Sequence, residues 1–235
     1  SPYVNKRKDK FGGSLENRMR FMKLVLAEVM RCAGDDMAVV VKHNMYDGFK
    51  SGIQIPESIQ IAKEIESFGV HGIVLSAGFV SKAPMAVMRG AMPIKTLAYY
   101  MDMAKFWWLK AALHLVGRIM IPTVPFKEAY FLEDAKKFRA ELKCPLIYVG
   151  GLVSRAKIDE VLNEGFECVQ MARALVHDTD FVNKLAASDE TYRSGCKHSN
   201  YCIGRMYTKE MRCHHCVDNL PKKIQKEIAK AEAEL

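Results

Sequence analysis

The stretch that decides the fold is residues 145–178, PLIYVGGLVSRAKIDEVLNEGFECVQMARALVHD. It contains two short apolar runs, at residues 146–149 and 168–171, each too brief for a helix and each closed by a turn or a charge. Between them, residues 155–163 place apolar side chains at helical spacing. Parallel strands need a crossover of this kind, so the stretch predicts a strand–helix–strand unit.

Both predicted strands are followed by residues that suit a bound phosphate. After the first come Gly150 and Gly151, where the backbone can approach a ligand closely. After the second come Ala172 and Arg173, which offer backbone N–H groups and a cation. In a (β/α)8 barrel the phosphate-binding site lies after strands 7 and 8. We therefore interpret these two strand ends as the site that binds the phosphate of flavin mononucleotide (FMN). The alternative is a tight turn and an ordinary surface charge.

The rest of the chain continues the alternation of strands and helices. Residues 38–42 (AVVVK) and 72–77 (GIVLSA) are apolar runs typical of buried parallel strands. Residues 56–68 and 131–142 have helical spacing. Four strands separated by helices indicate a parallel sheet with helices outside it. We therefore predict an α/β fold, and within that class half of a (β/α)8 TIM barrel.

Lys42 is a charged residue at the end of the predicted strand 38–42. In this type of barrel the catalytic groups lie at the C-terminal ends of the strands, which makes Lys42 a candidate site residue. The alternative is a lysine that lays its stem on apolar surface and keeps its amine in water.

Residues 79–124 are too long for a simple connecting loop and predict an insertion with structure of its own. Within it, residues 96–120 carry Trp107 and Trp108 among several charged residues. Those charges argue against a membrane span, which needs about 20 largely uncharged residues. We expect a core or lid helix, while an amphipathic helix on the barrel mouth, a partner or a membrane surface stays open.

The composition is that of a globular domain, with 235 residues, 49% hydrophobic and 26% charged. The net charge of +8 would suit nucleic acid, but the basic residues are scattered, and phosphorylated ligands suit the charge equally well. We expect a small-molecule ligand and no nucleic-acid partner. No signal peptide is recognisable, which predicts a cytoplasmic location. The chain begins with Ser1 in a loop-like stretch, so we expect a piece of a longer protein.

Residues 5–21, NKRKDKFGGSLENRMRF, carry a specific family motif. They resemble the segment after the fourth strand in the Old Yellow Enzyme family of FMN-dependent NAD(P)H:flavin oxidoreductases, whose pattern is N-x-R-x-D-x-Y/F-G-G-S-x-x-N-R-x-R-F. The sequences VGG at 149–151 and MARAL at 171–175 resemble the family's last two strands. The resemblance extends to about residue 216. It implies the C-terminal half of an FMN-binding TIM barrel, strands five to eight, with a long insertion after strand 6.

The same resemblance implies roles for individual residues. Lys42 matches the cation, usually Arg, that lies beside flavin N1 and O2. It would be catalytic and cofactor-binding, because it would stabilise the negative charge of the reduced flavin. Gly150 and Gly151 match the first part of the phosphate-binding positions. Ala172 and Arg173 match the second part, with Ala in place of the more usual Gly.

An NAD(P)H:flavin oxidoreductase of the ene-reductase type is the activity that this resemblance implies, acting on an α,β-unsaturated carbonyl or another acceptor. The family's substrate-polarising residues precede the matched segment, so we expect residues 1–235 alone to be inactive. Whether the protein forms a homo-oligomer is left open by the sequence. The alternative from another class is a phosphate-binding barrel without redox chemistry.

The tail, residues 191–235, is predicted as a Cys- and His-containing segment with a terminal helix, separate from a barrel part at residues 1–190. Relatives resembling 2,4-dienoyl-CoA reductase bind a [4Fe–4S] cluster here through C-x2-C-x3-C-x11-C. This chain has Cys196, Cys202, Cys213 and Cys216, but Ser199 stands at the second position and the spacing is one residue short. We therefore argue against a cluster and assign no metal ligand. Two alternatives stay open for the tail. One is a metal-binding interaction module in which Cys and His side chains together hold zinc, and the other is a packed loop without metal.

Overall fold

The computed structural model describes residues 1–100, 106–120, 123–206 and 209–233. The chain divides into two compact units that interleave along the sequence. The first unit holds residues 1–83, 129–150 and 159–170. The second unit holds residues 84–128, 151–158 and 171–235.

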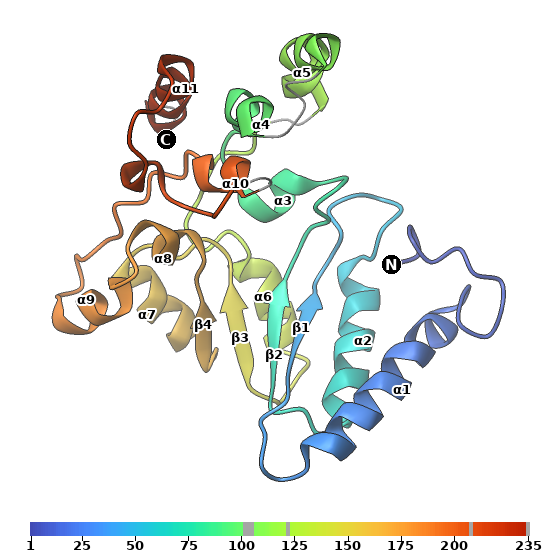
Figure 1. Cartoon of the computed structure of the whole chain (residues 1–235). Helices are drawn as coiled ribbons and strands as arrows, with labels where there is room; N and C mark the ends of the chain where they lie inside the picture. Colours follow the sequence, from blue (N-terminus) through green and yellow to red (C-terminus); the bar gives the residue numbers. More distant parts are fainter. Residues whose placement is uncertain (101–105, 121–122, 207–208, 234–235) are drawn as a thin grey trace. The chain divides into compact units, whose positions relative to one another are not determined.

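The first unit is built on a four-stranded parallel sheet in the order β1-β2-β3-β4 (Figure 1). Its strands are β1 (Val40–Asn44), β2 (Gly72–Ser76), β3 (Leu146–Val149) and β4 (Cys168–Gln170). The register pairs Lys42 with Val74, and Tyr148 with both Leu75 and Val169. Helices lie in the connections between neighbouring strands, as parallel pairing requires. The predicted α/β class with a parallel sheet is confirmed.

Helices pack on one face of this sheet. Helix α2 (Ile55–Ser67) contacts β1, and α6 (Leu132–Arg139) contacts β3. Helix α1 (Leu15–Ala33) precedes β1, and α7 (Arg155–Asn163), whose residues are divided between the two units, connects β3 to β4. His43 of β1 faces α2 and α6, because its ring contacts Ser58 and Phe138 there. Helix α1 packs against α2, with an ion pair of 2.7 Å between Arg18 and Glu57. The apolar side of the helices and the sheet together form the core of this unit.

The opposite face of the sheet is exposed at its outer strands β1 and β4, while Val74 of β2, which pairs with Lys42, is buried. On β1, Val40 is 52% exposed and Lys42 is also exposed, and on β4 so is Gln170. The amine of Lys42 nevertheless donates to Gln170 Oε1 at 3.3 Å, although two strands separate them. A flat sheet would hold their backbones about 14 Å apart, since neighbouring strands are spaced about 4.8 Å. This face is therefore concave.

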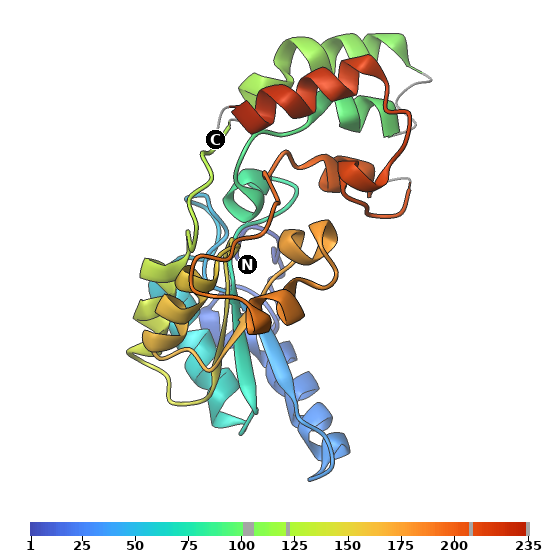
Figure 2. The ribbon, with the colours of Figure 1, turned by 90° about the vertical axis from the view of Figure 1, so that its left-hand side faces the viewer.

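The second unit is helical. Its elements are α3 (Pro84–Met88), α4 (Ile94–Tyr100), α5 (Trp107–Met120), α8 (Arg173–His177), α9 (Phe181–Ala187), α10 (Tyr201–Arg205), the 3-10 turn η2 (His214–Cys216) and α11 (Lys222–Ala233). Helix α11 lies across α4, as Figure 2 shows. The Glu227 carboxylate of α11 accepts from the backbone N–H groups of Lys95 and Thr96 at 2.8 and 2.9 Å. It thereby satisfies donors at the start of α4 that the helix itself leaves free.

Lys42 lies in the middle of its strand, and the prediction that it ends the strand was wrong. Strand β1 continues through His43 and Asn44. These polar residues fit inside a strand because both side chains have partners. His43 bonds to Ser58, and Asn44 Nδ2 donates to Asp47 Oδ1 at 2.8 Å. The predicted strand was therefore too short at its C-terminal end, because polar residues there were interpreted as the start of a loop.

Residues 79–124 have structure of their own, as predicted, in helices α3, α4 and α5. The stretch 96–120 is not one helix, since α4 ends at Tyr100 and residues 101–105 lie outside the described residues. Trp107 is 80% exposed, so of the expected core or lid helix the core alternative does not hold for this residue, and the lid alternative stays a prediction. None of the described helices is both long and apolar enough to span a membrane.

Candidate functional site

Lys42 is a charged side chain on the concave face of the first unit. Its neighbours along β1 alternate sides, so Val41 and His43 turn toward the helices while Lys42 turns to the concave face. The amine donates a hydrogen bond to Gln170 of β4. An exposed amine on a concave face offers a positive charge to a ligand bound there.

His43, next to Lys42, is buried in the core between the sheet and the helices. Its Nε2 lies 2.7 Å from Ser58 Oγ and 3.0 Å from the Ser58 carbonyl oxygen. Burial lowers the pKa of His43 to about 4, because the charged ring would lose its hydration. Its place on the helix side makes it a structural residue.

This buried imidazole predicts a loss of stability in mild acid. The folded pKa of His43 lies below the unfolded value of about 6.5, so the unfolded chain binds the proton more tightly. Its contribution is complete above pH 6.5 and is lost as the pH falls toward 4. Between pH 7 and pH 5 we expect the free energy of unfolding to drop by about 2 kcal/mol from this group. Urea titrations of the wild type and His43→Gln would show the smaller drop in the variant. An NMR titration of His43 with a midpoint above 6 would contradict it.

Gly150 and Gly151 follow β3, as the sequence predicted. At position 150, however, packing within the protein by itself requires a glycine. A Cβ at Gly150 would lie 2.5 Å from the hydroxyl of Tyr148. That hydroxyl is buried, accepts from Phe131 N at 3.1 Å and donates to the Gly150 carbonyl at 3.1 Å. Burial raises the pKa of Tyr148 well above its usual value. Gly151 adopts a φ of 73°, a left-handed conformation that favours glycine.

Ala172 and Arg173 lie in the second unit, where α8 begins at Arg173. The Arg173 guanidinium donates to Asn200 Oδ1 at 2.7 Å and lies 5.8 Å from the centre of the Phe126 ring. His198 stacks on the same ring at 3.5 Å between centroids. Burial, and then the charges of Arg173 and Arg193, lower the pKa of His198 to about 3. Arg173 is therefore a positioned cation rather than a loose surface charge.

The partners of Arg173 were missed in the sequence. Asn200 and His198 both adopt positive φ values, 57° and 51°, that side chains other than glycine rarely take. Asn200 Nδ2 also donates to the Arg89 carbonyl at 2.8 Å. The two residues lie within the Cys-rich stretch, between Cys196 and Cys202. The signal in the sequence that could have predicted them is the polar pair His198 and Asn200 between Cys196 and Cys202.

A cavity in the second unit joins Arg173 to the Cys-rich tail. Its lining includes Arg173, His177, Cys196, His198, Ser199, Cys202 and Cys213. Burial raises the pKa of the Cys202 thiol to about 11, with Cys196 adding to the effect. Three thiols line the cavity and Ser199 stands where the four-thiolate pattern has its second cysteine. Cys216 is exposed. The described donor set does not fit a [4Fe–4S] cluster held by four thiolates.

The four parallel strands and the helices that connect them define the class of α/β proteins. Within that class, residues 1–124 match the model of the NADH:flavin oxidoreductase / NADH oxidase family. The chain belongs to this family, which confirms the resemblance to the Old Yellow Enzymes.

Three known proteins illustrate the similarity. The chain is 37% identical over 210 residues to 4,4'-dithiodibutanoate disulfide reductase of Rhodococcus erythropolis, covering 88% of this chain and 51% of that protein. It is 28% identical to NADH oxidase of Thermoanaerobacter brockii, over 70% of this chain and 24% of that protein. Part of the solved 2-naphthoyl-CoA reductase has the same fold, with a TM-score of 0.66 and 20% identity over 96% of this chain and 29% of that one. The chain thus spans about a quarter to a half of these relatives.

Proposed function

We propose that the protein is an FMN-dependent oxidoreductase that takes its electrons from NAD(P)H. We further propose that this chain forms strands five to eight of its TIM barrel, with residues 79–124 as the insertion after strand 6. The observation that carries the proposal is the exposed amine of Lys42 on a concave sheet face. Family membership supports it, since the matched family is one of flavin oxidoreductases.

We propose that Lys42, Gly150, Gly151, Ala172 and Arg173 would hold FMN. Bound FMN would supply the hydride chemistry, while the protein supplies orientation and charge. Lys42 would hold a positive charge where negative charge develops during reduction, and it keeps that charge without the planar fork of Arg. Gly151 leaves room for a close backbone approach, and Arg173 would pair with a phosphate through its guanidinium. Gly150 and Ala172 complete the proposed phosphate-binding positions.

The acceptor is proposed to be a small organic molecule. An α,β-unsaturated carbonyl fits the family resemblance, and one relative is named as a multifunctional alkene reductase/demethylase. An organic disulfide is the second candidate, because a relative with 37% identity is named as a disulfide reductase. We also propose a cytoplasmic location, and a division into residues 1–190 and a tail at 191–235. The predicted boundary falls inside the second compact unit and stays a prediction.

The test is purification of the longer protein that contains this chain. We expect a yellow protein with flavin absorbance that oxidises NADH or NADPH when 2-cyclohexenone or 4,4'-dithiodibutanoate is added. Comparing the two acceptors would assign the substrate class. A colourless protein that binds phosphorylated compounds but oxidises neither nucleotide would favour the barrel without redox chemistry.

Arg173→Ala is expected to weaken FMN binding about 10- to 100-fold, since a hydrogen bond to a charged group contributes about 1.5–3 kcal/mol. The matched control is Arg31→Ala, which removes an exposed guanidinium paired with Glu28 on α1. Flavin retained after gel filtration, and FMN titration of the apoprotein, measure the effect. Equal FMN affinity in the two variants would remove Arg173 from the phosphate site.

A further inference from the structure

Three metal-ligating side chains meet in the second unit, outside the residues proposed for FMN. One ligand atom each from His177, Cys213 and His215 lies within 4.8 Å of the other two. His177 Nδ1 is 3.4 Å from Cys213 Sγ, and the rings of His177 and His215 are 5.2 Å apart between centroids. His177 ends α8, while Cys213 and His215 lie at η2. Folding therefore brings together ligands that are 36 residues apart.

A carboxylate lies beside this cluster. His214, His215 and Glu232 also bring ligand atoms within 4.8 Å of one another. Glu232 Oε1 is shielded from water and lies 3.3 Å from His214 Nε2, an ion pair that forms only when His214 is protonated. With a neutral His214 that does not donate to it, the oxygen has no hydrogen-bond donor among the described residues. Shielding an acceptor without a donor is costly. A nearby cation would remove that cost.

The chemistry of the donor set selects the metal. Two imidazoles and one thiolate are the ligands that zinc takes in proteins, while calcium and magnesium take oxygen. Tetrahedral zinc, with bonds of about 2.0–2.3 Å, places its ligand atoms about 3.3–3.8 Å apart. The atoms here need to close by at most about 1.5 Å. We propose that His177, Cys213 and His215 bind a zinc ion, with Glu232 as an outer carboxylate beside His215.

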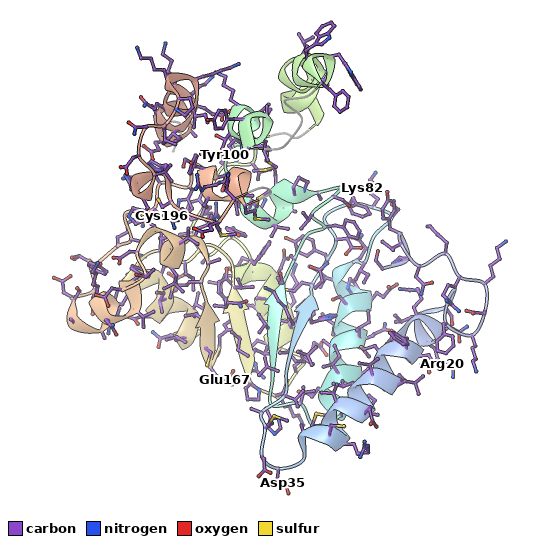
Figure 3. All side chains as sticks on the ribbon, viewed as in Figure 1. Arg20, Asp35, Lys82, Tyr100, Glu167 and Cys196 are labelled. Carbon is purple, nitrogen blue, oxygen red and sulfur yellow. The ribbon has the colours of Figure 1, made fainter. Side chains whose placement is uncertain are left out.

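These ligands differ from those of an iron–sulfur cluster. A cluster would use the thiols of Cys196 and Cys202 together with Cys213, and it would have no need of His177. Figure 3 marks Cys196, which precedes α10 in the tail. Only Cys213 is common to the two sets. The two possibilities therefore predict opposite effects for His177 and Cys202.

Zinc here would act as a structural clamp. It would tie the end of α8 to η2, and through Glu232 to α11, so that its binding free energy becomes folding free energy of the tail. Arg173, the proposed phosphate ligand, is the first residue of α8 and His177 is its last. The zinc would hold that helix in place. This inference does not depend on the redox function.

The experiment measures zinc in the longer protein, purified without chelator, by elemental analysis and by titration of the metal-free form. We expect about one zinc per chain. His177→Ala and Cys213→Ser should each lower zinc affinity by more than about 100-fold, while Glu232→Gln should lower it about 10- to 100-fold, as for an outer partner. The matched controls are His198→Ala and Cys202→Ser, which line the same cavity and should keep wild-type affinity.

Cobalt reports the ligands directly. Substituted Co²⁺ should give the intense visible bands of a tetrahedral site and a thiolate charge-transfer band that is lost in Cys213→Ser. Circular dichroism of each variant separates a lost ligand from a lost fold. The wild type decides the matter even if a variant unfolds, since a metal-free wild type that takes up no zinc at micromolar concentration overturns the proposal. Iron and sulfide that depend on Cys202, or full zinc affinity in a folded His177→Ala, would overturn it as well.

Discussion

Replacing Lys42 by Met is expected to leave FMN bound and to slow its reduction by NAD(P)H on the order of 100-fold, the usual cost of losing one preorganised charge-stabilising group. Lys42 is exposed on the concave face, where its amine donates to the side chain of Gln170. Its positive charge matters little for oxidised flavin, which is neutral in its ring system. The charge matters more once electrons arrive, so the rate should suffer more than the affinity.

Stopped-flow bleaching of the flavin at saturating nucleotide measures this rate. Lys42→Arg, which keeps the charge, should stay close to the wild type. Lys63→Met is the matched control, since Lys63 lies on α2 and pairs with Glu141 at 2.6 Å on the helix side of the sheet. A reduction rate in Lys42→Met equal to that of Lys63→Met would show that Lys42 has no part in the chemistry.

The strands were predictable because their signal is local. Leu146–Val149 was predicted with the bounds that the structure has, since a short apolar run closed by two glycines has few alternatives. Strand β1 was cut short at Lys42 because its last two residues are polar. Only tertiary contacts, such as that of His43 with Ser58, show that polar side chains can be satisfied there.

The candidate site was less predictable because its partners come from distant parts of the chain. Gly150 suggested a ligand, yet its immediate neighbour is the Tyr148 hydroxyl. Asn200 reaches Arg173 across 27 residues, and His177 reaches Cys213 across 36. A lone histidine at a helix end carries no signal in the sequence. Sequence patterns therefore place strand ends well, but they do not say which side chains meet there.

Residues 1–235 produced alone are expected to self-associate or aggregate, to bind FMN weakly and to show no NAD(P)H oxidation. Strands β1 and β4 each have one neighbour among the described strands, so both present an unpaired edge. Such edges pair readily with other chains. The concave face also leaves an apolar side chain in water, since Val40 is 52% exposed.

Helix α1 adds a second unpaired apolar surface. Phe21, Leu24 and Val29 are 66%, 59% and 42% exposed, and their spacing puts them on one side of the helix. A protein rarely leaves such a stripe in water unless another part of the structure covers it. In the proposed barrel, the strands and helices that precede this chain would supply that cover.

Gel filtration with light scattering measures the association, and a flavin titration with an NADH assay measures the function. The control is the longer protein, which should be soluble, yellow and active under the same conditions. Phe21→Lys with Leu24→Lys should reduce aggregation of the isolated chain without restoring NADH oxidation, because these changes treat the exposed stripe and not the missing strands. A monodisperse monomer of residues 1–235 that binds FMN and oxidises NADH would show that four strands suffice for the site. The half-barrel proposal would then fall, because the edges of β1 and β4 would have no need of further strands.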